Sequence, residues 1–297
     1  MTSLPLNKLV VIGVGLIGGS FALALRHTGM VKQIVGIGRS QKNMQRAVEL
    51  GVIDEIASNP AAALKNADFV LLAMPVGQTS HIMAQIAPCL ESETIISDVG
   101  STKQDVITAA RTHLTRHLTR FIPSHPIAGT EFSGAEAAST HLFLDKHLII
   151  TPLTENSEQA ISLVTALWQH CGAKVSCMPA DQHDRILAIV SHLPHILAFT
   201  LMNHVHANIE DKPEEVLRFA GSSFRDCTRI ASSSPEMWRD ICLANQETLL
   251  KQIDVYQNKL SDLRTLLANN DGEALEKTFL QARETRQQWL ESNQLLK

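Results

Sequence analysis

A glycine-rich turn near the start of the chain restricts the possible fold more than any other sequence feature. The apolar run 8–14 leads into a G-x-G-x-x-G pattern, and residues 16–28 then read as a helix. In a strand-turn-helix unit the first glycine permits the tight turn, the second lets the backbone approach a pyrophosphate, and the third allows close packing of helix on strand. The helix start offers N–H groups and a positive dipole end to phosphates. This pattern predicts a dinucleotide site that includes Gly13, Gly15, Leu16, Ile17 and Gly18.

Alternating strand and helix segments follow the turn. We expect strands at 33–37, 69–73 and 94–98, separated by helices at 41–50 and 81–89. Such alternation indicates a parallel sheet with right-handed crossovers. Three further apolar runs are candidates to extend this sheet, with a helix at 158–170 between the last two: 121–123, 147–151 and 174–178. The predicted fold class is an α/β Rossmann domain with a mostly parallel, doubly wound sheet over residues 1–178.

Strand signals end near residue 178, so residues 179–297 are expected to form an all-α helical domain. Polar breaks at 209–213, 232–235 and 269–272 separate its helices. The segment 186–205 is apolar on nearly every face, which a small helical domain can bury only by surrounding it, often with a second subunit. We therefore predict a dimerisation domain and a homodimer. The same segment raises the question of a membrane span, but its histidines, Asn203 and Pro194 favour a buried helix and no membrane partner.

Composition limits the remaining classes. The chain of 297 residues is 44% hydrophobic, enough for two domains, and its net charge of -4 argues against a nucleic-acid surface. Five cysteines without C-x-x-C spacing indicate reduced thiols and no zinc site. The N-terminus lacks signal-peptide features, so we expect a cytoplasmic protein, and no regulatory domain is expected beyond the helices.

The end of the second strand bears on cofactor choice. An acidic side chain usually binds the ribose 2'-hydroxyl of NAD there, but this chain has Arg39 and Ser40 instead. A planar guanidinium suits a 2'-phosphate, and a hydroxyl adds a second donor. We therefore expect NADP or NAD as cofactor, with NADP slightly favoured. The alternative is an exposed arginine stacked on the adenine of NAD.

Three polar blocks carry the candidate chemistry: residues 97–103, 124–131 and 224–231. The first two follow predicted strands, so Ser101 and His125 should lie at the carboxyl end of the sheet, near the nicotinamide. A histidine there is suited to accept a hydroxyl proton during hydride removal. A simple turn histidine is the alternative.

Together these blocks resemble the prephenate and arogenate (cyclohexadienyl) dehydrogenase family over nearly the whole chain. The resemblance rests on five ordered motifs: the glycine turn, DVGSTK at 98–103, SHPIAGTEFSG at 124–134, SHLPH at 191–195, and FRDCTRIASSSPEMWRDICLAN at 224–245. It implies oxidative decarboxylation of prephenate or arogenate, giving 4-hydroxyphenylpyruvate or tyrosine, with hydride transfer to NAD(P).

The resemblance also implies roles for single residues. His125 is the base and Ser101 orients it, while Arg229 pairs with a substrate carboxylate. His192 and His195 point toward the pocket, with His195 nearer the substrate side chain. Glu131 resembles the family's pocket-lining acid, and Trp238 is a candidate to be contributed to the site of the other subunit across the dimer. Plainer readings stay open: Arg229 as a partner of Asp226, His192 as a core histidine, and Trp238 as a core aromatic.

Two rival functions remain. Hydroxyacid dehydrogenases of the 6-phosphogluconate dehydrogenase type resemble this layout but use a lysine on the first long helix of the second domain, and residues 185–211 contain none. The second rival is a sensor that binds a dinucleotide but catalyses no reaction. Between the two substrates, His195 would suit the keto oxygen of prephenate and Glu131 the ammonium of arogenate.

Overall fold

The computed structural model describes residues 4–130, 132–208 and 217–295, which divide into two compact units, Met1–Gln246 and Glu247–Lys297. The predicted boundary between residues 178 and 179 falls inside the first unit, between its last strand and the helix that follows. That boundary stays a prediction. The candidate site lies wholly in the first unit.

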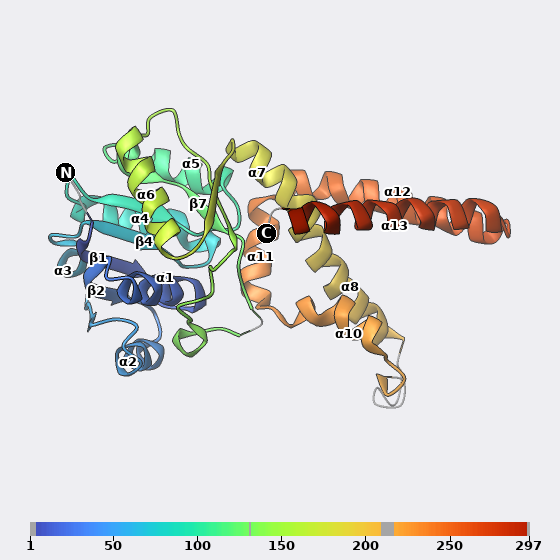
Figure 1. Cartoon of the computed structure of the whole chain (residues 1–297), viewed down its shortest axis with the longest axis horizontal. Helices are drawn as coiled ribbons and strands as arrows, with labels where there is room; N and C mark the ends of the chain where they lie inside the picture. The colour runs from blue at the N-terminus through green and yellow to red at the C-terminus, as the bar shows by residue number, and fades with distance from the viewer. Residues whose placement is uncertain (1–3, 131, 209–216, 296–297) are drawn as a thin grey trace. The chain divides into compact units, whose positions relative to one another are not determined.

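A six-stranded parallel sheet forms the centre of the first unit (Figure 1). Its order is β3-β2-β1-β4-β5-β6, and every neighbouring pair is parallel. The central strands read as continuous apolar runs because helices cover both faces, and two separate clusters of buried side chains flank the sheet. The Rossmann-like fold is confirmed. The strands are β1 (Leu6–Ile12), β2 (Val31–Ile37), β3 (Glu55–Ile56), β4 (Phe69–Leu72), β5 (Ile95–Asp98) and β6 (Phe121–Ile122).

Two of the apolar runs offered as extensions of this sheet form a second sheet instead. In this three-stranded sheet β8 (His147–Ile150) pairs antiparallel with β7 (Ser124–Pro126) and parallel with β9 (Lys174–Cys177). The prediction that 147–151 and 174–178 extend the main sheet was therefore wrong. Pro123 gives the physical reason, since it has no N–H to continue the ladder after β6, and its carbonyl oxygen accepts from the Thr151 N–H at 3.0 Å.

In the described residues, six α-helices connect the strands. Those predicted from periodicity are present within a few residues, whereas α3 and α5 were not predicted. They are α1 (Leu16–His27), α2 (Gln41–Glu49), α3 (Pro60–Leu64), α4 (Thr79–Ile86), α5 (Gln104–His113) and α6 (Glu158–His170).

After β9 the described chain is helical, as predicted. The first unit holds α7 (Ala180–Leu187), α8 (Leu193–Ala207), α10 (Ser222–Thr228), a 3₁₀ turn (Arg229–Ser232) and α11 (Pro235–Ala244). The long helices α12 (Gln246–Ala268) and α13 (Gly272–Leu295) follow. The breaks predicted at 232–235 and 269–272 are observed, and the break at 209–213 lies outside the described residues.

The predicted helix 186–205 is interrupted by a π turn, Ala188–His192, which joins α7 to α8. Pro194, in the first turn of α8, cannot donate a backbone hydrogen bond to the preceding turn, and a locally widened helix accommodates that loss. By length and composition alone, Ala180–Ala207 is the one described helical stretch apolar enough to cross a membrane, and 28% of its most apolar window is buried.

Candidate active site

The glycine turn has the geometry that a bound pyrophosphate requires. Gly13 adopts a φ of +99°, and a side chain there would collide with the Ala73 carbonyl. Gly15 precedes α1, and no atom lies within 4 Å of the position that its Cβ would take. No side chain caps the start of α1 and no acid lies in its first turn, so the N–H groups around Leu16 and Ile17 are available to an anion. The residues present fit a dinucleotide.

Arg39 and Ser40 lie just after β2, where the adenosine ribose is expected. The Arg39 side chain is 70% exposed and lies 3.7 Å from the Glu236 carboxylate. Ser40 caps α2, because its Oγ accepts from the Asn43 N–H at 3.3 Å. The Ser40 hydroxyl proton remains available for donation while its oxygen serves the helix.

A buried ion pair shapes the loop after β5. The fully buried Lys103 ammonium contacts Asp98, whose carboxylate also accepts from the N–H groups of Gly100 at 2.7 Å and Ser124 at 3.1 Å. Asp98 thereby ties the loop that carries Ser101 to β7, which carries His125.

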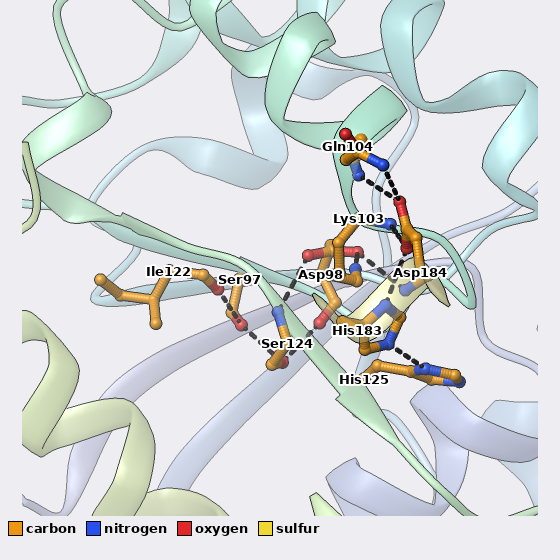
Figure 2. Close-up of polar contacts among 10 residues, drawn as sticks. Ser97, Asp98, Lys103, Gln104, Ile122, Ser124, His125, His183 and Asp184 are labelled. Carbon is orange, nitrogen blue, oxygen red and sulfur yellow. Dashed lines mark hydrogen bonds and ion pairs between the residues drawn. The ribbon is translucent and has the colours of Figure 1, made fainter. Parts of the chain in front are cut away.

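A chain of side-chain hydrogen bonds leads from His125 to a buried carboxylate (Figure 2). His125 Nδ1 lies 2.8 Å from His183 Nε2, and His183 Nδ1 lies 2.8 Å from Asp184 Oδ1. Asp184 also accepts from the backbone N–H groups of Lys103 at 2.9 Å and Gln104 at 3.0 Å. His125 Nε2 makes no hydrogen bond to a described residue, so it is the ring's free polar atom.

Burial determines the protonation states of the side chains in this hydrogen-bonded series. It holds the pKa of His125 well below its ordinary value of 6.5, with the charges of His183, Lys103 and His192 acting in the same direction. Burial also lowers the pKa of His183, against the opposing hydrogen bond to Asp184. For Asp184 burial acts to raise the pKa, but hydrogen bonds from His183 and the two N–H groups outweigh it and lower it. Neutral imidazoles therefore face an ionised carboxylate.

His192 belongs to the same network. Asn245 Nδ2 lies 2.9 Å from the Asp184 carbonyl oxygen and 3.2 Å from His192 Nδ1, so the amide links α11 to α7 and to the π turn. Burial lowers the pKa of His192 to about 4, partly offset by the Asp184 charge and by the Ser101 backbone. That backbone lies beside the His192 ring, yet His192 Nε2 has no hydrogen bond of ordinary geometry.

His195 and Trp238 form a stacked pair. Their ring centroids are 3.7 Å apart with an angle of 21° between planes, and the His192 ring lies 6.1 Å from Trp238. Burial and the nearby Arg229 charge lower the pKa of His195. The Arg229 side chain is exposed and forms no ion pair with Asp226 in the part of the chain that the structure describes.

The structure thus gathers most of the predicted site residues into one region. His125, Ser101, His192, His195, Trp238 and Arg229 are connected by the contacts above, while Glu131 lies outside the described residues. Trp238 is only 7% exposed and stacks on His195, so it belongs both to the core and to this region.

Sequence reasoning assigned no role to five residues of the network. Asp98 and Lys103 lie within the DVGSTK motif and Asn245 ends the last motif, so their motifs carried a signal. His183 and Asp184 lie in no motif noted in the sequence, and only the fold brings them to His125.

Comparisons with known proteins cover nearly the whole chain. Residues 21–177 match the family model described as prephenate dehydrogenase, nucleotide-binding domain. Residues 179–281 match the model described as prephenate dehydrogenase, dimerization domain. A cyclohexadienyl dehydrogenase of Zymomonas mobilis is 36% identical over 280 residues, covering 94% of this chain and 95% of that protein. A prephenate dehydrogenase of Bacillus subtilis is 38% identical over 281 residues, covering 94% and 75%.

Solved structures give the same family. The prephenate dehydrogenase of Aquifex aeolicus, in complex with hydroxyphenyl propionate and NAD⁺, superposes with a TM-score of 0.88 at 33% identity, covering 95% of this chain and 98% of that one. An arogenate dehydrogenase of Synechocystis gives a TM-score of 0.77 at 28% identity, covering 95% and 99%. The chain therefore belongs to the prephenate dehydrogenase family, and it is an oxidoreductase of that family.

Proposed function

We propose that this chain catalyses the oxidative decarboxylation of prephenate, arogenate or both with NAD(P), as a step of tyrosine biosynthesis. One observation carries the proposal: His125 is a buried, neutral imidazole whose Nδ1 is engaged and whose Nε2 is free. It follows β5 and β6 at the carboxyl edge of the sheet, the edge at which the glycine turn binds a dinucleotide.

The reaction requires a protein side chain that can take up one proton. The substrate ring carries a hydroxyl on one carbon and a carboxylate on the opposite carbon. His125 Nε2 accepts the hydroxyl proton while hydride leaves the hydroxyl-bearing carbon. The bond from the opposite ring carbon to the carboxylate breaks as carbon dioxide departs, and its electron pair enters the ring to give a phenolate, whose oxygen then takes the proton back from His125. When bound, the oxidised nicotinamide supplies the hydride acceptor. Neutral His125 is ready for this role because its lowered pKa keeps it unprotonated near neutral pH.

Substrate binding falls to the residues around His195. Arg229 presents an exposed guanidinium beside His195, suited to bidentate pairing with a substrate carboxylate. The stacked His195 and Trp238 rings offer a rigid wall for the cyclohexadienyl ring. Ser101 and His192 complete the proposed site beside His125, and Glu131 is proposed from the family resemblance alone.

NADP is the cofactor that we slightly favour over NAD. Arg39 and Ser40 directly follow β2, the position at which the adenosine ribose of a dinucleotide is expected, and neither residue is acidic. Arg39 is exposed, and its contact with Glu236 at 3.7 Å is loose enough to exchange for a phosphate.

The helical residues from 179 onward are proposed to form a homodimer interface, in the cytoplasm. The region matches a family dimerization model, and apolar side chains on the π turn, Ile189 and Val190, are 51% and 65% exposed. Sedimentation should give twice the chain mass, and Val190→Glu should shift it toward the monomer while Lys42→Glu, on an exposed position of α2, leaves it unchanged. A monomeric wild-type protein would refute this assignment.

The test of function is direct. Purified protein is mixed with prephenate or arogenate, each with NAD or NADP, and reduced nicotinamide is followed by absorbance. We expect reduction in at least one mixture, and His125→Asn should lower kcat by about 10²–10⁴-fold with little change in cofactor affinity. Silence in all four mixtures with cofactor binding intact would favour a sensor or another hydroxyacid substrate.

A further inference from the structure

We propose that His183, held by Asp184, is a positioning residue that fixes the tautomer of His125 and so presents Nε2 as the proton acceptor. The inference deepens the proposed function, because it rests on His125 being the base. No motif noted in the sequence contains the pair, and only the fold brings it to His125.

The hydrogen-bonded series from His125 through His183 ends at a buried carboxylate. Asp184 is 1% exposed and its carboxylate accepts from two backbone N–H groups as well as from His183. Those donors keep Asp184 ionised, and an ionised carboxylate can only accept. His183 Nδ1 must therefore carry a hydrogen and donate it across the 2.8 Å contact.

The contact with Asp184 also determines the role of the other nitrogen of His183. Its ring is fully buried, and burial lowers its pKa, so the ring is neutral and carries a single N–H. With that hydrogen on Nδ1, His183 Nε2 has only a lone pair. It can accept a hydrogen bond but cannot donate one.

His183 in turn determines the tautomer of His125. His125 Nδ1 lies 2.8 Å from this lone pair, so His125 Nδ1 must be the donor. A neutral His125 then has its own lone pair on Nε2, the free atom of the ring. The rings lie 5.1 Å apart at 64°, which also limits rotation of His125 about its side-chain bonds.

The surroundings of the two rings act against a positive charge on either of them. Lys103 disfavours positive charge on both rings, and His192 adds to this effect at His125. Asp184 and Asp98 favour positive charge at His183, yet burial outweighs them. Burial and these charges therefore keep both rings neutral, with the His125 Nδ1–H donated to His183.

Two substitutions separate positioning from other roles. His183→Gln keeps a carbonyl oxygen able to accept from His125 and an amide able to donate to Asp184, but it cannot titrate. His183→Ala removes the acceptor. We expect His183→Ala to lower kcat about 10–100-fold with KM within about threefold of wild type, and His183→Gln to restore kcat to within about threefold. His170→Ala, at an exposed histidine on α6, is the control and should behave as wild type.

The pH profile supplies a readout that a purely structural role would not move. Removing the His183 ring opens the buried surroundings that hold the pKa of His125 down, so that pKa rises in His183→Ala. The base loses activity as pH falls through its pKa, so the acid limb of kcat shifts to higher pH. An unshifted limb with unchanged kcat would overturn the proposal, as would a His183→Gln variant as slow as His183→Ala.

A measurement on the unsubstituted protein separates this inference from the proposed function. Nitrogen-15 histidine spectra of the whole protein, assigned by comparison with His125→Asn and His183→Gln, report which nitrogen carries hydrogen in each ring. We expect the Nδ1–H form for both rings. The Nε2–H form at His125 refutes the positioning role whatever the activity, whereas Nδ1–H forms without turnover refute only the proposed reaction.

Discussion

The buried His192 predicts a measurable loss of stability in mild acid. Its side chain has no exposed surface, and its pKa falls from 6.5 to about 4. The unfolded chain takes up a proton on this ring as pH falls below about 6.5, whereas the folded chain excludes that proton until about pH 4. Stability from this group is therefore complete at neutral pH and declines as pH falls through that window.

The magnitude follows from the gap between the two values. At about 1.4 kcal/mol per pH unit, His192 alone costs about 2 kcal/mol of unfolding free energy by about pH 5 and about 3 kcal/mol in full. His192→Asn removes the titration while leaving an amide oxygen to accept from Asn245 Nδ2. It also leaves a small cavity, whose cost does not depend on pH.

Urea unfolding of both proteins, at one protein concentration between about pH 7.5 and pH 5, measures the difference. We expect wild type to be the more stable at neutral pH and the two curves to converge by about 2 kcal/mol toward about pH 5. His170→Asn, at an exposed position, is the control and should run parallel to wild type. Parallel curves for His192→Asn would refute the argument that burial keeps this ring neutral.

Three further predictions test other parts of the site. Arg229→Ala should raise KM for substrate roughly 10–150-fold with little effect on cofactor KM, and a change in cofactor KM alone would misplace the residue. Arg39→Ala should raise KM for NADP at least about tenfold and KM for NAD less than about threefold, and equal effects would remove the 2'-phosphate contact. Lys103→Met should cost about 3–5 kcal/mol of unfolding free energy because it leaves Asp98 charged and unpaired. The double variant with Asp98→Asn should recover part of that loss, and no recovery would argue against a stabilising Lys103–Asp98 ion pair.

Local patterns explain why much of the fold could be predicted from the sequence. The glycine turn and the apolar runs of β1, β2, β4 and β5 are local signals, and each became the expected element. The second sheet was missed because strand signals specify a strand but not its neighbours, and Pro123 redirects the pairing. Helix α5 was missed because no local side chain caps its start, and the Gln104 N–H instead donates to Asp184, 80 positions away.

The candidate site was predictable to the extent that its residues lie in motifs. His125, Ser101 and Arg229 were found through their motifs. His183 and Asp184, in contrast, act through contacts that span 58, 80 and 81 positions of the sequence. Nothing in a single sequence indicates that a histidine and an aspartate in the middle of α7 will meet β7 and α5. Tertiary structure alone supplies that information.

The π turn makes the site depend on the length of the chain as well as on its residues. It holds one more residue in its loop of backbone than an α-helical turn would, just before His195. Deleting the exposed Val190 would remove that extra residue and allow an uninterrupted α-helix, so the side chains before and after the turn would keep nearly the same relative orientation. The same deletion at the exposed Arg185, in the regular α-helical turns of α7, would instead rotate the residues beyond it by about 100° and turn His195 away from Trp238, so it should be as damaging as the loss of His195 itself.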